Sequence, residues 1–283
     1  GFPLISSCCP AWIKYAEQFY PEVLPLISTC KSPQQMFGSI IKYYFAPEQG
    51  INPNSIYSVA VMPCLAKKFE AQREEMTYKT ISDVDVVLTT RELSRLIQLY
   101  GIDIHNLEPQ TADSPFGMRS SAGKLFGTSG GVTEAILRTL HYKMTGKELQ
   151  SSKLQDLRMV NGIKEIAIKI GGKEFNVVLA NGLTGIEKLM DGIKNKTINA
   201  HFIEVMACPG GCVNGGGQPF KSGDKDVKAR IRTLYDIDDA DTLKVAHKNP
   251  LIIDLYEKYL EKPGSEKAKK NLHTCYTKRD VLL

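Results

Sequence analysis

The sequence contains 283 residues, of which 42% are hydrophobic and 24% are charged, so the chain can bury a substantial core and has no compositional sign of disorder. It contains no run of about 18 apolar residues and no basic-then-apolar leader, which argues against a membrane span and a secretory signal. The net charge of +5 is mild and scattered, which argues against a nucleic-acid partner but allows a basic surface for an acidic redox protein.

Short apolar runs rich in β-branched residues alternate with segments of helical periodicity. The runs predict strands at residues 55–62, 84–89 and 202–206. The periodic segments predict helices at about residues 10–20, 33–47, 65–76, 91–100, 130–144, 184–196 and 225–236. Strands that alternate with helices indicate an α/β fold with parallel strands, in which ligands gather at the carboxyl ends of the strands.

Three other segments lack this alternation. Residues 164–179 predict a β-hairpin that turns at Gly171 and Gly172, which we interpret as an inserted surface element. Residues 103–121 have little periodicity and contain two prolines, so a loop is predicted there. Residues 261–270 are polar and basic, and we expect a solvated surface segment.

Seven cysteines occur in a chain too large to need disulfide staples, and their odd count favours metal or redox chemistry in a reducing compartment. Cys8 and Cys9 are adjacent, and Cys208 and Cys212 are four residues apart. Cys64 and Cys208 each follow a predicted strand and enter a turn that contains Pro or Gly. Two strand ends would therefore direct thiolates into one crevice.

The most informative segment runs from Cys208 to Pro219 and contains five glycines. Its two thiolates could reach neighbouring corners of one cluster, and the glycines would let backbone N–H groups approach inorganic sulfide. The structural alternative is a glycine-rich turn around two buried cysteines. Zinc is less well supported, because structural zinc favours paired C-x2-C knuckles and the sequence has none. An iron–sulfur cubane takes four thiolates from scattered positions, but the spacing alone does not choose four of the seven.

Three segments together resemble the signatures of the iron-only (FeFe) hydrogenases, in the order of that family: Ser7-Cys8-Cys9-Pro10-Ala11-Trp12, Met62-Pro63-Cys64-Leu65-Ala66-Lys67-Lys68-Phe69-Glu70, and the segment from Glu204 to Pro219. The segments 32–38 and 273–279 also look like this family, so the resemblance covers essentially the whole chain. We therefore expect residues 1–283 to form the H-cluster catalytic domain, incomplete at its N-terminal side. The expected fold is α/β, with two lobes of mostly parallel sheet flanked by helices and the metal cluster in the crevice between them.

The resemblance implies that Cys9, Cys64, Cys208 and Cys212 ligate a 4Fe-4S cluster. Cys212 would also bridge this cubane to a di-iron subcluster that carries CO, cyanide and a bridging dithiolate amine. The protein would then supply orientation, outer hydrogen bonds and a dry cavity, while the cofactors carry most of the chemistry.

Three residues match catalytic positions of the family. Cys8 would pass protons to the bridging amine, a task for which a thiol suits because its pKa can be tuned. Without the resemblance, Cys8 would be interpreted as a small buried hydrophobe. Lys67 would donate to a cyanide ligand, and only the motif register separates it from Lys68. Ser28 would provide the next hydroxyl on the proton route behind Cys8.

Five further residues match positions that line the di-iron pocket, although Met and Phe at strand ends are otherwise usually plain core. These expected cofactor-binding residues are Ser32, Gln34, Met62, Phe126 and Met206. By contrast, Cys30 and Cys275 match no ligand position and are interpreted as non-ligands.

The resemblance also implies partners. A ferredoxin-like electron carrier and the maturation enzymes of the family are expected. The family has a further stretch ahead of the cysteine doublet that supplies two acids to the proton route. Three alternatives stay open for it: a position before residue 1, a position on a second chain, or its absence, which would affect proton delivery. The thiols favour a cytoplasmic location, and because Gly1 is not a natural start, organellar and periplasmic locations stay open.

The function expected from this resemblance is the reversible reduction of protons to molecular hydrogen. Two alternatives keep an iron–sulfur cluster without this activity: a protein of cluster assembly, which would tend to lack the cysteine doublet, and a hydrogen sensor, which would turn over slowly. A Rossmann-like enzyme is the weakest alternative, because no phosphate-binding glycine loop follows a predicted strand.

Overall fold

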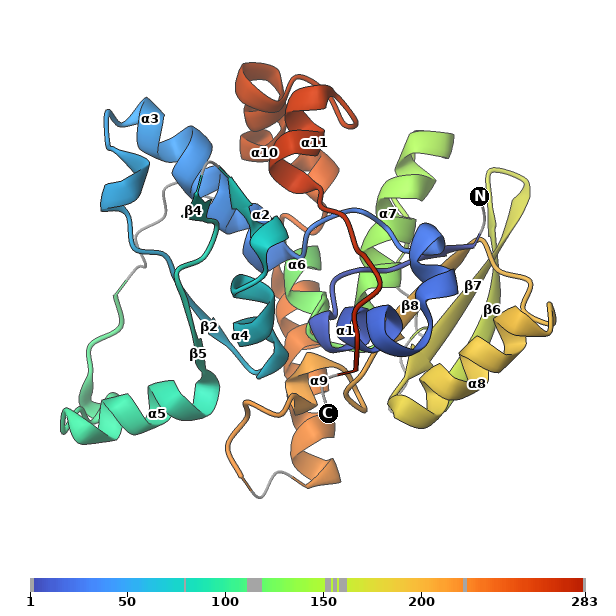
Figure 1. Cartoon of the computed structure of the whole chain (residues 1–283), viewed down its shortest axis with the longest axis horizontal. Coiled ribbons are helices and arrows are strands. Elements are labelled where there is room, and N and C mark those ends of the chain that lie inside the picture. Colours follow the sequence, from blue (N-terminus) through green and yellow to red (C-terminus); the bar gives the residue numbers. More distant parts are fainter. Residues whose placement is uncertain are drawn as a thin grey trace.

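The computed structural model describes residues 3–78, 80–110, 119–150, 154, 157, 162–220 and 223–281. Figure 1 shows two lobes, with a larger sheet on one side of the molecule, a smaller sheet on the other, and helices between and around them. Part of the predicted loop at 103–121 lies outside the described residues, and its described first part contains one short 3-10 turn at Ile104–Asn106.

The larger sheet has four strands in the spatial order β1-β8-β7-β6. β1 and β7 both pair with β8 in parallel, whereas β6 and β7 form an antiparallel hairpin. The strands are β6 (Gly162–Ile170), β7 (Lys173–Asn181), β8 (Phe202–Met206) and the two-residue β1 (Leu4–Ile5). The predicted hairpin therefore exists, and one of its strands joins the main sheet.

β7 lies in the middle of the larger sheet, so the interpretation of the hairpin as an inserted surface element is wrong. Val178 and Ala180 pack into one core with Trp12 of helix α1, and Val177 and Leu179 pack into a second core on the opposite face. Helices cover both faces of this sheet: α1 (Pro10–Phe19) and α8 (Leu183–Lys194) on one side, α7 (Gly131–Thr145) on the other. In a strand that is buried on both faces, consecutive residues are apolar because they point to opposite faces of the sheet, and residues 177–180 have this pattern.

The smaller sheet consists of two parallel strands, β2 (Val59–Met62) and β5 (Val86–Thr89). Ala60 and Met62 pack into a small core, whereas Val59 and Val61 are 51% and 44% exposed on the other face. The helices α4 (Ala66–Ala71) and α5 (Thr90–Leu99) follow the two strands, and α5 has no buried residue and lies at the edge of the molecule (Figure 1). One face of this sheet is therefore uncovered in the described chain.

Between the two sheets and around them lie the remaining elements. They are α2 (Pro33–Ile40), α3 (Ala46–Glu48), the hairpin β3 (Thr77–Tyr78) and β4 (Ile81–Ser82), α6 (Ala122–Leu125), α9 (Asp224–Ala240), α10 (Pro250–Leu255) and α11 (Glu266–Leu272). Most residues of the segment 261–270 are exposed, but α11 begins within it and buries Ala268. Among the described residues, no helix is both long and apolar enough to cross a membrane.

The predicted elements agree with the structure in kind and order, and their ends differ. The helix predicted at 33–47 is α2, a π-turn at Ile41–Phe45 and α3 in succession. The helix predicted at 65–76 ends at Ala71 and continues as a 3-10 turn at Glu74–Met76. The α/β class with parallel strands and two lobes is confirmed.

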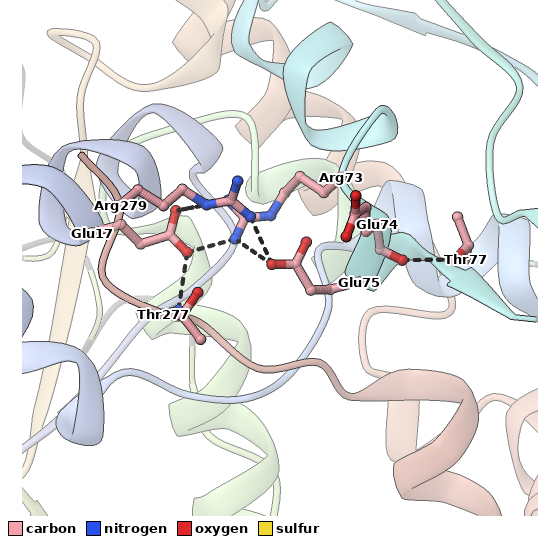
Figure 2. A network of polar contacts seen from close by, with 7 residues as sticks. All are labelled: Glu17, Arg73, Glu74, Glu75, Thr77, Thr277 and Arg279. Atoms are coloured by element: carbon pink, nitrogen blue, oxygen red, sulfur yellow. Dashed lines mark hydrogen bonds and ion pairs between the residues drawn. The ribbon is translucent and has the colours of Figure 1, made fainter. Parts of the chain in front are cut away.

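The C-terminal segment crosses back over α1 and is held there by a buried ionic network (Figure 2). The guanidinium of Arg73 donates to both carboxylate oxygens of Glu17 at 2.9 and 2.6 Å. Arg279 makes ion pairs with Glu17 at 3.3 Å and with Glu75 at 2.7 Å, and the backbone N–H of Thr277 donates to Glu17 at 3.3 Å. This network joins α1, the turn after α4 and the end of the chain.

Candidate metal centre

The doublet Cys8-Cys9 and Cys208 leave the larger sheet at the same edge. β1 pairs in parallel with β8, with Ile5 opposite Ile203, so the residues after both strands emerge side by side. Cys9 then caps the N-terminus of α1, whose first residue is Pro10. A proline is well placed there because the first N–H of a helix has no intrahelical partner. Cys208 enters the glycine-rich loop.

Glycines in that loop bring it against the turn that carries Cys64 in the other lobe. The backbone N–H of Gly217 donates to the carbonyl of Pro63 at 3.1 Å. A Cβ on Gly215 would lie 1.9 Å from the same carbonyl oxygen, and one on Gly217 would lie 2.8 Å from the nitrogen of Cys64. These contacts require glycine because no side chain fits into such a short approach. Two of the five glycines therefore bring protein segments together.

The thiols of Cys9, Cys64, Cys208 and Cys212 are close enough to affect each other electrostatically. Burial raises the pKa of Cys208 to about 11 and that of Cys212 to about 12, with Cys9 and Cys64 adding to both shifts. Burial and Cys9 also raise the pKa of Cys64. All seven cysteines are free thiols, and these four come from the two lobes and the loop between them. Bound iron would oppose these shifts, because a metal cation stabilises the thiolate form.

Lys67 is buried beside the doublet. Its ammonium donates to the backbone carbonyl of Cys8 at 3.2 Å and to Oε2 of Glu70 at 2.8 Å. Burial acts to lower the pKa of Lys67, but Glu70 and the nearby thiols outweigh it, so the pKa is raised and the side chain stays charged. Lys68 instead reaches Glu92 near the surface, at 2.9 Å. The two neighbouring lysines, which only the motif register distinguished in the sequence, therefore have different surroundings: Lys67 is buried beside the cysteine doublet and Lys68 lies near the surface.

Cys8 is partly buried next to this lysine. Burial raises the pKa of its thiol well above the usual value, and Cys9 and Glu204 act in the same direction. Ser28 follows a short bridge between Ile5 and Ile27, and its backbone N–H donates to the carbonyl of Ile5 at 2.8 Å. Ser28 therefore lies beside the strand that leads into the doublet.

The expected pocket residues lie on elements that surround the cysteines. Met62 ends β2 before Cys64, and Met206 ends β8 before Cys208 and is fully buried. Phe126 precedes a turn in which Gly127 accepts a hydrogen bond from Val213, next to Cys212. Ser32 and Gln34 are buried at the start of α2. Met62, Met206 and Phe126 thus adjoin the segments that carry Cys64, Cys208 and Cys212, and Ser32 contacts Glu70 of α4, while the exposed Cys275 is on the C-terminal segment.

The sequence analysis gave no role to two residues that hold the glycine-rich loop and the start of α7. Glu204 is buried on β8 and accepts hydrogen bonds from the backbone N–H groups of Gly130 at 2.6 Å and Thr133 at 2.8 Å, at the start of α7. Asn181 accepts from the N–H of Gly210 at 2.9 Å and donates to the carbonyl of Cys208 at 3.2 Å. Glu204 stood in a quoted motif without a role, and nothing in the sequence singled out Asn181.

These residues fit a multi-iron cofactor better than a single ion. Among residues 3–281 that the structure describes, no three His, Cys, Asp or Glu side chains are placed to hold one metal ion. Four thiols spread over two lobes are instead the donor set of an iron–sulfur cubane. Within the same described part, the buried amide of Gln34 and the hydroxyl of Ser129 have no protein hydrogen-bond partner, and buried polar groups of this kind usually contact a ligand or water.

Two family models together match nearly the whole chain. Residues 1–216 match the iron only hydrogenase large subunit, C-terminal domain, and residues 224–279 match the iron hydrogenase small subunit. The chain belongs to the iron-only hydrogenase family. Iron–sulfur cofactors are implied by this membership, and the match of residues 224–279 shows that α9 to α11 correspond to what that family model describes as a small subunit.

Individual hydrogenases are similar along the full chain. The NADP-reducing hydrogenase subunit HndD of Solidesulfovibrio fructosivorans is 44% identical over 99% of this chain, and iron hydrogenase 1 of Clostridium pasteurianum is 41% identical over 98%. The chain spans about half the length of these two relatives, 48% and 49%. A structure of apo [FeFe]-hydrogenase HydA1 from Chlamydomonas reinhardtii matches 99% of this chain and 77% of its own, with a TM-score of 0.86 and 36% identity.

Relatives named for cluster assembly are also similar. The cytosolic Fe-S cluster assembly factor narfl of Xenopus tropicalis is 35% identical over 98% of this chain, which covers 59% of that protein. Hydrogenases and assembly factors are thus both similar in sequence along this chain, so the reaction has to be argued from the site.

Proposed function

We propose that this chain forms the catalytic part of a hydrogenase that reversibly reduces protons to molecular hydrogen. A 4Fe-4S cluster would be held by Cys9, Cys64, Cys208 and Cys212, with Cys212 shared with a di-iron subcluster. When bound, the di-iron group with its CO, cyanide and dithiolate-amine ligands supplies the redox chemistry. The observation that carries the proposal is that a fifth thiol, Cys8, and a buried lysine lie directly beside the four clustered thiols.

The chain itself would contribute a proton carrier, a fixed charge and a dry cavity. The thiol of Cys8 would hold and release a proton beside the di-iron group, and Ser28 would provide the next hydroxyl on the proton route. The ammonium of Lys67 would favour an anionic ligand because it is buried and charged. Gln34, Met62, Phe126, Met206 and Ser32 would exclude water and orient the group.

The partners follow from the same proposal. The mild net positive charge favours an acidic, ferredoxin-like electron carrier. Maturation enzymes of the family would build the di-iron group, and the stretch expected ahead of the doublet would come from the same polypeptide or a second chain. The absence of a disulfide among the described cysteines supports a reducing compartment, so we propose a cytoplasmic location and keep organellar and periplasmic locations as alternatives.

The test is an infrared spectrum of protein matured anaerobically with the family's maturation enzymes. We expect stretching bands of iron-bound CO and cyanide, which neither side chains nor a plain cubane produce. A cubane without these bands would instead favour the cluster-assembly function of the narfl-type relatives. Bands with very slow turnover would favour a hydrogen sensor.

The proton role of Cys8 is tested by the variant Cys8→Ser. Because a hydroxyl at this position would hold its proton far more tightly, we expect hydrogen evolution to fall by about 10²- to 10⁴-fold while the infrared bands persist. Cys275→Ser changes an exposed thiol on the C-terminal segment and should leave turnover unchanged. Full turnover of Cys8→Ser would contradict the proposed role.

A further inference from the structure

Glu70 is a buried carboxylate to which the proposed function assigns no role. It lies one helical turn after Lys67 on α4 and is 3% exposed. One of its carboxylate oxygens, Oε2, accepts two hydrogen bonds, from Nζ of Lys67 at 2.8 Å and from Oγ of Ser32 at 2.8 Å. The three side chains are almost completely buried, so Glu70 connects α2 to α4 inside the protein.

Ser32 makes this contact and does not cap its helix with its side chain. It occupies the N-cap position of α2, where a serine hydroxyl normally accepts a hydrogen bond from a free N–H of the first turn, but it makes no such bond. The hydroxyl donates to Glu70, and in this orientation it accepts no hydrogen bond from the first turn of α2.

The same carboxylate restrains Lys67. A lysine side chain has four flexible methylene groups, and a single contact to the carbonyl of Cys8 at 3.2 Å would leave its direction poorly defined. Glu70 provides a second, charged contact at 2.8 Å. Charge-assisted hydrogen bonds of this kind are stronger and more directional than neutral ones. The ammonium is therefore fixed between Glu70 and the backbone of the cysteine doublet.

We propose that Glu70 is a positioning residue that fixes the Lys67 ammonium toward the di-iron ligands and Cys8, with Ser32 holding Glu70 in turn. This inference rests on the proposed function. Glu70 also neutralises the charge of Lys67 inside the protein, so loss of its charge changes both the direction of the ammonium and the local field.

The experiment compares three variants in matured protein by infrared spectroscopy. Glu70→Gln keeps the shape of the side chain and removes its charge, and Ser32→Ala removes one hydrogen bond and leaves both charges. Glu92→Gln is the matched control, because Glu92 accepts from the neighbouring Lys68 near the surface. We expect Glu70→Gln to shift and broaden the cyanide bands and to reduce turnover by about 10- to 100-fold, at unchanged cubane iron content. Ser32→Ala should shift the bands in the same direction by less.

Other outcomes are also decisive. Cyanide bands of Glu70→Gln that coincide with those of the unmodified protein and of Glu92→Gln would overturn the proposal. If Glu70→Gln fails to fold or to bind the cubane, Ser32→Ala decides: shifted bands support the positioning role and unchanged bands refute it. Absence of CO and cyanide bands from the unmodified protein would instead refute the proposed function.

Discussion

At the scale of single residues, the site depends on backbone contacts as much as on thiols. The resemblance singled out four cysteines, and the structure brings them together with Cys8 and Lys67, while their roles as ligands stay predictions. The glycines were expected to let N–H groups reach inorganic sulfide. Gly215 and Gly217 show a further reason, because they let the loop contact the Pro63-Cys64 turn across the two lobes.

This reason predicts different outcomes for two adjacent glycines. Gly215→Ala should prevent cubane incorporation, because its Cβ would lie 1.9 Å from the carbonyl oxygen of Pro63 and would push the turn that carries Cys64 away. Gly216→Ala should be tolerated, since the nearest atom to its Cβ, in the side chain of Leu65, lies at 3.4 Å. Iron and acid-labile sulfide per chain, measured after anaerobic reconstitution, test the difference. Equal iron content in both variants would show that the contact does not position Cys64.

The roles of Asn181 and Glu70 could not be predicted from the sequence, although Glu70 ends one of the segments that resemble the family. Their importance comes from partners that lie 27 to 38 positions away in the chain, Cys208 and Ser32, and a single sequence gives no signal for such pairs. A buried carboxylate at helical spacing from a lysine looks like a surface ion pair. Glu70 differs from such a surface pair in its burial and in its contact with Ser32, which makes no side-chain cap hydrogen bond to α2.

At the scale of elements, periodicity predicted the α/β class, most helices, the strands β2, β5 and β8, and the hairpin of β6 and β7. It missed β1, because two residues are too few to show a pattern, although β1 directs the cysteine doublet to the edge of the sheet. The hairpin was predicted as an inserted surface element, but β7 lies between β8 and β6 inside the larger sheet. The pairing of β7 with β8 is a long-range contact, and no local pattern predicts it.

The start of α5 provides an acid-dependent element. Glu92 and Thr89 form a capping box, and the backbone N–H of Thr89, followed by Lys68, lowers the pKa of Glu92 from 4.5 to about 2. Since the folded pKa lies below the unfolded one, this contribution is complete above pH 4.5 and is lost as the pH falls toward 2.

Glu92→Gln should therefore lower the urea midpoint of the metal-free protein near pH 6 and have progressively less effect as the pH falls toward 3. The reason is that the unmodified protein loses the same interaction on protonation. Thr89→Ala, which removes the cap, should cost about 1 kcal/mol near pH 6. Urea titrations at several pH values provide the measurement. A difference between Glu92→Gln and the unmodified protein that does not vary with pH would contradict the capping role of the charge.

At the scale of the whole molecule, buried charges join the part that matches the small-subunit model to the rest. Arg138 of α7 makes an ion pair with Asp238 of α9 at 2.6 Å, and Asp238 also accepts from Ser121. The network around Glu17 holds the C-terminal segment against α1 (Figure 2). Buried pairs of this kind are strongly destabilising when one partner is lost, because the other charge stays buried.

Glu17→Gln should destabilise the protein by roughly 3 kcal/mol, because Arg73 would remain buried without its main counter-charge. The matched control is Asp236→Asn in α9, whose partner Arg232 is 82% exposed and whose loss should change stability by less than about 0.5 kcal/mol. Thermal or urea unfolding of both variants gives the comparison. Similar stability of the two variants would show that the network contributes little to the fold.

The pairing of β1 with β8 also has a consequence for the order of events during synthesis. Leu4 finds its partner Phe202 only after most of the chain has left the ribosome, and Arg279 reaches Glu17 later still. Cys9 and Cys64 therefore emerge long before Cys208 and Cys212, and the four thiols can meet only after residue 212 has left the ribosome. The proposed cluster would then be inserted late in synthesis or after it, and the early cysteines would have to stay reduced and unoccupied until that point.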